Sequence, residues 1–284
     1  MRGRRATVVT VFIAMTLTVV KAGADEADAQ YRKGLQLMQQ GNFTEAQAAL
    51  EEAIKLRPGY AAAELTLGNV LRKQKRCDQA IAHYENAIKA KSDDAFAQGN
   101  LGVCYHQLKR EDDAIRALEA AVAAAPNEPQ WRYSLGALYR QKKQYDKALP
   151  HLEKAVELAP NDVDALRNLA VALRQAEQLG RAEAILKKAI AMAPEDGGLR
   201  FDLGVVYRKQ QKTAEAIAAY REAVRVDERN ADAWWDLAAL LSHERSTKEA
   251  VAAYDRYIEL VAQRDPRGAA AAREQVRQLT GARR

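Results

Sequence analysis

The sequence predicts an all-helical protein made of seven helical hairpins followed by one C-terminal helix. Three observations predict this fold. Hydrophobic residues form 48% and charged residues 29% of the 284 positions, enough to build a core. The chain is rich in Ala, Leu, Lys, Glu, Arg and Gln, which favour helices. Small and large apolar residues also recur at a constant interval of 34 residues, so we expect a repeat protein.

The N-terminus has the pattern of a secretory signal peptide, which we assign to residues 1–24. A basic start precedes a largely apolar run of fifteen residues, Ala6 to Val20, shorter than the about 20 residues that span a bilayer. Ala22 and Ala24 are the small residues expected before a cleavage site. We expect cleavage after Ala24 and export, most simply to a bacterial periplasm, without membrane insertion of the mature protein. The alternative is that the segment is retained as a short anchor.

The net charge of +6 is concentrated at the N-terminus. The first 24 residues contain four basic residues, Arg2, Arg4, Arg5 and Lys21. Without these four, the sequence has 40 basic and 38 acidic residues. A nearly neutral body gives no reason to expect binding to the phosphate backbone of a nucleic acid. We therefore expect protein or peptide partners, and no nucleic acid.

The 34-residue interval runs through the sequence without insertion or deletion. One register holds small residues, at Gly34, Gly68, Gly102, Gly136, Ala170, Gly204 and Ala238. A second holds only alanine, at Ala46, Ala80, Ala114, Ala148, Ala182, Ala216 and Ala250. Large residues follow in a third, at Leu50, Tyr84, Leu118, Leu152, Leu186, Tyr220 and Tyr254. Helical spacing within each unit predicts two antiparallel helices, whose axes approach closely at the small residues.

A last helix is predicted over residues 265–284. Asp265 followed by Pro266 is typical of a helix start. Ala272, Val276 and Leu279 then form a thin apolar stripe. We expect this helix to cap the exposed face of the last hairpin, as the solubility of a repeat stack requires.

The small, large and proline registers resemble those of the tetratricopeptide repeat family, with register prolines at Pro58, Pro126, Pro160 and Pro194. The resemblance implies a right-handed α-solenoid over 25–264. Its seven units are 27–60, 61–94, 95–128, 129–162, 163–196, 197–230 and 231–264. Departures are mild, because Ser92 and Glu228 replace proline and Ala170 and Ala238 replace glycine.

The resemblance also implies that the first helix of each hairpin lines a concave, ligand-binding side. Arginine recurs there at Arg72, Arg140, Arg174 and Arg208, which we call the arginine register. The candidate peptide-binding residues are Asn69, Arg72, Lys73, Asn100, His106, Tyr133, Arg140, Arg167, Asn168, Arg174, Phe201 and Arg208. Arginine pairs with carboxylates, asparagine binds backbone amides and aromatic rings provide apolar anchors. This set suits an extended acidic peptide or a C-terminal carboxylate; alternatively, the arginines are merely solvated.

The sequence contains few residues that could support catalysis or metal binding. None of the four histidines has a second ligand at metal spacing, and the four serines lie in no nucleophile motif. We therefore predict no catalytic activity, no metal and no cofactor. Cys77 and Cys104 are expected on neighbouring antiparallel helices, but about one turn (roughly 6 Å) out of register. This offset favours two separate thiols over a disulfide, without excluding the bond.

The leading hypothesis is a non-catalytic, exported adaptor that binds an extended segment of a cell-envelope protein in its concave groove. The alternative is a structural subunit of a pilus, secretion or cell-wall complex that docks through its convex face or its ends. The sequence decides neither the partner nor the oligomeric state.

Overall fold

The computed structural model describes residues 24–281, and every regular element in this range is a helix. The all-α prediction is confirmed. The predicted signal segment lies outside the described residues except for Ala24. Between residues 24 and 281 the structure has no helix both long and apolar enough to cross a bilayer. Residues 24–39 are helical, and the following helices are α2 (Phe43–Leu56), α3 (Ala61–Lys73), α4 (Cys77–Ala90), α5 (Ala95–Gln107), α6 (Glu111–Ala124), α7 (Pro129–Gln141), α8 (Tyr145–Leu158), α9 (Val163–Gln175), α10 (Leu179–Met192), α11 (Gly197–Lys209), α12 (Thr213–Val226), α13 (Ala231–His243), α14 (Thr247–Val261) and α15 (Pro266–Thr280).

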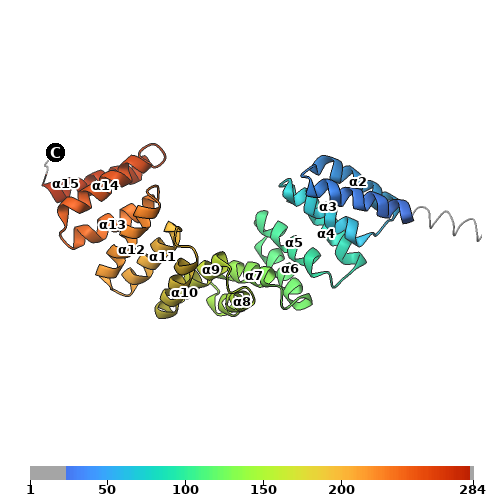
Figure 1. Ribbon diagram of the computed structural model, residues 1–284, viewed down its shortest axis with the longest axis horizontal. Helices are drawn as coiled ribbons and strands as arrows, with labels where there is room; N and C mark the ends of the chain where they lie inside the picture. The colour runs from blue at the N-terminus through green and yellow to red at the C-terminus, as the bar shows by residue number, and fades with distance from the viewer. Residues whose placement is uncertain (1–23, 282–284) are drawn as a thin grey trace, which may run out of the picture. The chain divides into compact units, whose positions relative to one another are not determined.

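The protein divides into two compact units, unit 1 up to Leu138 and unit 2 from Tyr139. Within each unit, successive hairpins stack side by side, as Figure 1 shows. The first helices of the hairpins are residues 24–39 and the odd-numbered helices α3 to α13, and the second helices are the even-numbered helices α2 to α14. Each first helix from α5 onward begins 34 residues after the preceding one. The spacing in the sequence is therefore also the spacing of the elements.

Glycine allows the two helices of a hairpin to approach closely. A Cβ atom built on Gly68 would lie 2.6 Å from the Tyr84 ring, and one built on Gly204 would lie 2.5 Å from the Tyr220 ring. Both tyrosine side chains are fully buried. Any larger side chain at either glycine would displace a ring that fills the core, so the predicted role of the small register is confirmed.

The turn within each hairpin contains a feature that the sequence analysis did not foresee. After α3, the Lys75 N–H donates to Arg72 O and the Arg76 N–H to Leu71 O, both at 2.9 Å. This Schellman arrangement places one residue in the left-handed region, where glycine is favoured. The first hairpin has Gly41 there. Six other turns use a residue with a Cβ atom at φ values near 60°, namely Lys75, Lys109, Lys143, Glu177, Gln211 and Arg245.

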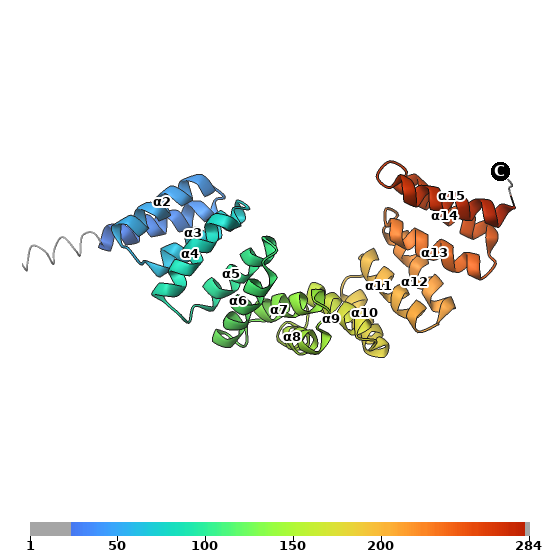
Figure 2. The same cartoon turned by 180° about the vertical axis from the view of Figure 1, so that it is seen from behind.

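The C-terminal helix caps unit 2 as predicted. The Asp265 carboxylate accepts a hydrogen bond from the Gly268 N–H at 3.0 Å, and Pro266 is the first helical residue. Helix α15 lies along α14 in both views of the molecule (Figures 1 and 2). It buries Ala269 and Ala272 completely. The stack in unit 2 therefore ends in a helix whose outer face is polar.

Cys77 and Cys104 form a disulfide, so the expectation of two separate thiols is wrong. Their Cα atoms are 5.1 Å apart, within the range that a disulfide spans. The expectation assumed a symmetric hairpin, in which Leu108 would be level with Cys77. The Cα separation shows that the packing of α5 on α4 brings the two cysteines together, which the symmetric hairpin did not. The bond joins α4 of one hairpin to α5 of the next.

Glu183 is a polar hub between neighbouring hairpins of unit 2. Its carboxylate accepts hydrogen bonds from Lys187 at 2.8 Å, and from Gln210 and Lys212 at 3.1 Å each. The Lys187 hydrogen bond, supported by those of Lys212 and Gln210, lowers the pKa of Glu183 to about 2, although burial opposes this. Because Gln210 and Lys212 follow α11, the cluster connects α10 to the next hairpin.

Replacing Lys109 by glycine should stabilise the protein. Glycine adopts the left-handed conformation without steric cost, so Lys109→Gly should raise the free energy of unfolding by about 0.5–1 kcal/mol. Urea denaturation followed by circular dichroism measures the change. Lys109→Ala retains the Cβ atom and is the matched control, for which we expect little change. An equal effect of alanine and glycine would contradict the explanation.

Removing the disulfide should destabilise unit 1. Its cysteines are 27 positions apart, and a closed loop of this length corresponds to about 3.5 kcal/mol in the chain-entropy model. We expect the variant with Cys77→Ala and Cys104→Ala to unfold at lower urea concentration. Reductant should shift the wild-type midpoint toward that of the variant, which should not respond. Two titratable thiols in the unreduced, unfolded protein would rule the bond out.

The Glu183 cluster should make stability depend on pH. Because the folded pKa lies below the ordinary value of 4.5, the stabilisation is complete above pH 4.5 and is lost as the pH falls toward 2. Glu183→Gln should cost about 1–2 kcal/mol at pH 7, allowing for partial solvent screening, and less at pH 3. Urea denaturation of both proteins at the two pH values measures this. Glu215→Gln, an exposed carboxylate, should change stability by under about 0.5 kcal/mol at either pH.

Candidate functional site

All twelve candidate residues lie on first helices, and none of them is buried. We call the surface that carries them the first-helix face. In unit 1 it comprises Asn69, Arg72 and Lys73 on α3, Asn100 and His106 on α5, and Tyr133 on α7. In unit 2 it comprises Arg140 on α7, Arg167, Asn168 and Arg174 on α9, and Phe201 and Arg208 on α11.

In unit 1, two asparagines from neighbouring hairpins meet. The Tyr84 hydroxyl and the Asn100 amide both donate to Asn69 Oδ1, each at 2.9 Å. These bonds fix the orientation of both side-chain amides. The Asn69 N–H groups and the Asn100 carbonyl have no other partner among residues 24–281, so they can bind the C=O and N–H groups of a peptide. Arg72 lies beside the same hydroxyl, and burial raises the pKa of Tyr84 to about 12 although the Arg72 charge opposes this.

Exposed apolar surface flanks this polar cluster. The Phe96 side chain is 49% exposed, and its ring packs edge-on against Trp131 with the centroids 6.0 Å apart. Gly99 lies under the Trp131 ring, since a Cβ atom there would come within 2.5 Å of it. His106 is exposed. Unit 1 therefore offers an aromatic contact next to amide groups.

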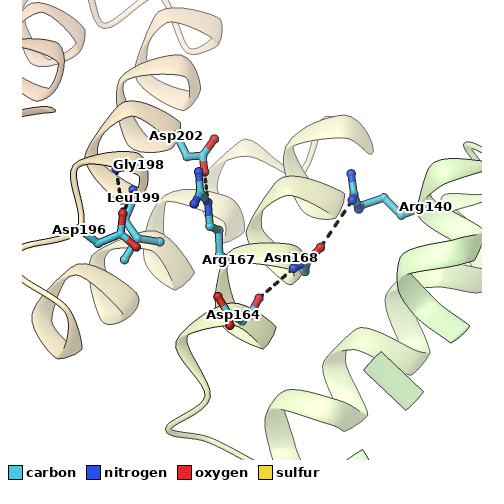
Figure 3. A network of polar contacts seen from close by, with 8 residues as sticks. All are labelled: Arg140, Asp164, Arg167, Asn168, Asp196, Gly198, Leu199 and Asp202. Carbon is cyan, nitrogen blue, oxygen red and sulfur yellow. Dashed lines mark hydrogen bonds and ion pairs between the residues drawn. The ribbon is translucent and has the colours of Figure 1, made fainter. Parts of the chain in front are cut away.

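In unit 2, Arg167 is bound by an aspartate from the next hairpin (Figure 3). Its Nε donates to Asp202 Oδ2 at 2.7 Å, and Asp202 is buried. Gly198 makes room for the guanidinium, because a Cβ atom there would lie 2.9 Å from Arg167 Nη2. Asp196 caps α11 by accepting from the Gly198 and Leu199 N–H groups. The cap and the glycine together position the guanidinium against Asp202.

The arginine register is not uniform. The Arg208 guanidinium lies 3.6 Å from Asp236, to which the Tyr220 hydroxyl also donates at 3.1 Å. Burial and the Asp236 charge raise the pKa of Tyr220, whereas Arg208 opposes this. Arg140 instead meets the Asn168 side-chain oxygen at 3.5 Å (Figure 3). Some members of the register are therefore neutralised by the protein itself and others are not.

Sequence reasoning missed Asp202 and Asp236, which pair with two of the candidate arginines. A signal for them existed in the 34-residue interval, because Asn100, Asn168, Asp202 and Asp236 share one register. Phe201, by contrast, packs on the Tyr220 ring with the centroids 5.7 Å apart. It therefore supports the core as well as the surface.

The first-helix face can form hydrogen bonds, ion pairs and apolar contacts, which are the elements of peptide recognition. Within residues 24–281, no group of three or more His, Cys, Asp or Glu side chains is placed to bind a metal ion.

A separate cleft of about 630 Å³ lies in unit 2 along the second helices α12 and α14, over α13. Its floor includes Trp234, Leu237 and Leu241, and its rim includes Arg225 and Arg256. Both arginines are bound to glutamates of the same unit. The cleft does not include any candidate residue of the first-helix face.

Known proteins share this architecture. A solved tetratricopeptide repeat protein, YrrB, described as having an unusual peptide-binding site, is 23% identical and matches 70% of this chain and 98% of its own with a TM-score of 0.61. A repeat protein from Parabacteroides merdae is 18% identical, matches 90% of this chain and 99% of its own, and has a TM-score of 0.62. PilF of Pseudomonas aeruginosa is 22% identical, matches 72% of this chain and 94% of its own, and has the same TM-score of 0.62. These likenesses show the fold.

Family models give a match over most of the sequence, although no curated protein sequence matches it. One model described as tetratricopeptide repeat matches residues 65–129 and 201–269. A second model with the same description matches residues 25–93 and 128–195. Together with the stacked hairpins, these matches identify the architecture. The chain belongs to the tetratricopeptide repeat family.

Proposed function

We propose that this protein is a non-catalytic scaffold that binds an extended, acidic or C-terminal peptide segment of a cell-envelope protein on its first-helix face. The Asn69–Asn100 pair carries this proposal. Its geometry leaves the Asn69 amide N–H groups and the Asn100 carbonyl oxygen available on adjacent hairpins. A peptide backbone presents the complementary groups, and the exposed Phe96 ring is an apolar anchor beside them.

The preference for an acidic segment rests on charge. Arg72 and Lys73 lie on α3 in unit 1, and Arg140 and Arg174 on the first helices of unit 2. None of the four has a carboxylate partner in residues 24–281. Carboxylates of a ligand form charge-assisted hydrogen bonds with such groups. YrrB, which has the same fold, is described as having a peptide-binding site, which agrees with this use of the architecture.

Export to the periplasm is part of the proposal. The signal-like pattern of residues 1–24 supports it, as does the Cys77–Cys104 disulfide. Disulfides persist in oxidising compartments and are rare in the cytosol. The two features come from different parts of the sequence and favour the same location.

A structural role in a multi-protein assembly is the second candidate. The cleft along α12 and α14 favours it, because it offers an indole ring and leucine side chains away from the first-helix face. Such a subunit would bind a neighbouring protein through its second helices.

Charge reversal on the first-helix face should abolish peptide binding. We expect the variant with Arg140→Glu and Arg174→Glu to bind array-selected acidic peptides at least 10-fold more weakly, because each lost charge-assisted contact is worth about 1.5–3 kcal/mol. Fluorescence polarisation at two salt concentrations measures this, and salt should weaken wild-type binding.

Arg225→Glu in the α12–α14 cleft is the matched control, since it reverses the same charge on the second helices. It should leave peptide affinity unchanged. If only Arg225→Glu lost peptide affinity, the result would favour docking through the cleft. Unchanged affinity in both variants would refute the first-helix face as the binding surface.

A further inference from the structure

Two residue registers meet at two of the junctions between neighbouring hairpins in unit 2. An arginine near the end of one first helix faces a residue near the start of the following first helix. The structure records this contact between Arg140 and Asn168 at 3.5 Å and between Arg208 and Asp236 at 3.6 Å. The arginines are 68 positions apart, as are their partners, so the two contacts are equivalent by register. They differ in one respect, since one partner is an amide and the other a carboxylate.

Where the partner is Asp236, the arginine charge is compensated within the protein. The Asp236 side chain is only 18% exposed and also accepts a hydrogen bond from the Tyr220 hydroxyl. A carboxylate thus lies beside the Arg208 guanidinium. A ligand carboxylate would have to compete with it, so this position is closed.

Where the partner is Asn168, the charge is not compensated. Asn168 presents its side-chain oxygen to Arg140 and donates its amide to Asp164 O at 3.0 Å. The Arg140 Nε atom is buried and has no hydrogen-bond partner. No carboxylate of residues 24–281 pairs with this guanidinium. A neutral amide cannot offset a cation that is partly removed from water.

The same situation recurs in unit 1. By register, Arg72 corresponds to Arg140 and Asn100 to Asn168. The Asn100 amide donates to Asn69, and Arg72 lies beside the Tyr84 hydroxyl. The Arg72 Nε atom is again buried without a partner, and no carboxylate in the described part of the sequence pairs with Arg72. The Arg174 Nε atom is also buried without a partner, but the residue at its register position is the carboxylate Asp202, which binds Arg167.

We propose that Arg72 in unit 1 and Arg140 in unit 2 are carboxylate-binding sites, completed by a partner's carboxylate in the position that Asp236 occupies beside Arg208. The inference rests on the proposed function, since it names the group recognised on the first-helix face. An acidic side chain and the C-terminus of a peptide carry the same group, so either can complete the site. Arg208 is the internal example of the completed arrangement.

Nuclear magnetic resonance of the arginine Nε–H groups tests this without any peptide. Three small probes separate the sources: N-acetylglutamic acid α-amide has a carboxylate only on its side group, N-acetylglutamine only at its terminus, and N-acetylglutamine amide has none. We expect at least one carboxylate probe to shift the Arg72 and Arg140 signals with dissociation constants in the millimolar range, about −4 kcal/mol. The amide probe should shift neither, and Arg208 should not respond to any.

Two matched substitutions should exchange the responses of Arg140 and Arg208 to the carboxylate probes. Asn168→Asp places a carboxylate beside Arg140 and should weaken its response at least tenfold. Asp236→Asn removes the one beside Arg208 and should make Arg208 respond. Urea denaturation of both variants shows that they remain folded. The proposal would be overturned if Arg72 and Arg140 of the wild type responded to the carboxylate probes no more than Arg208 does. It would also be overturned if Asn168→Asp left the Arg140 response unchanged.

A failure of the carboxylate sites can be distinguished from a failure of the proposed scaffold function. If the carboxylate probes bind as expected but no extended peptide binds the first-helix face, the sites stand and the scaffold proposal fails. If peptides bind and the variants with Asn168→Asp and Asp236→Asn bind them as the wild type does, the scaffold stands and the carboxylate sites fail.

Discussion

The close contact between a large side chain of the second helix and a small residue of the first is the constraint on which the hairpins depend. Tyr84 against Gly68 and Tyr220 against Gly204 leave no room for a Cβ atom. Such contacts set the distance between the two helices of a hairpin, and a side chain there would separate them. Since the hairpins are built from the same registers, successive hairpins within each unit stack on one another.

That contact gives polar side chains a structural as well as a recognition role. Arg167 with Asp202 and Arg208 with Asp236 join one hairpin to the next, so part of the positive charge of the first-helix face is used within the protein. The Glu183 cluster does the same beside α10. The first-helix face therefore carries both neutralised and uncompensated arginines. We propose that their distribution, rather than the number of arginines, determines where an acidic group binds.

The family relationship explains the framework and leaves the ligand open. The solved relatives share the fold at 18–23% identity, at which the surface residues differ freely. Function in such repeats lies in side chains placed on a common scaffold. For this protein we propose that those side chains are the Asn69–Asn100 pair and the uncompensated arginines. The disulfide ties α4 to α5.

The sequence by itself determined the helices, their 34-residue interval, the capping helix and the face on which the twelve candidate residues lie. These follow from local periodicity and from side-chain volume, which a single sequence records directly. Tertiary structure alone decided which arginines are neutralised, because Arg140 and Asn168 are 28 positions apart and meet only through the packing of two helices. It also decided the disulfide, since the packing of α5 on α4 brings the Cα atoms of Cys77 and Cys104 to 5.1 Å from each other. The left-handed turn at Lys75 was missed for the same reason: the hairpin's closure imposes a backbone conformation that the residue itself does not favour.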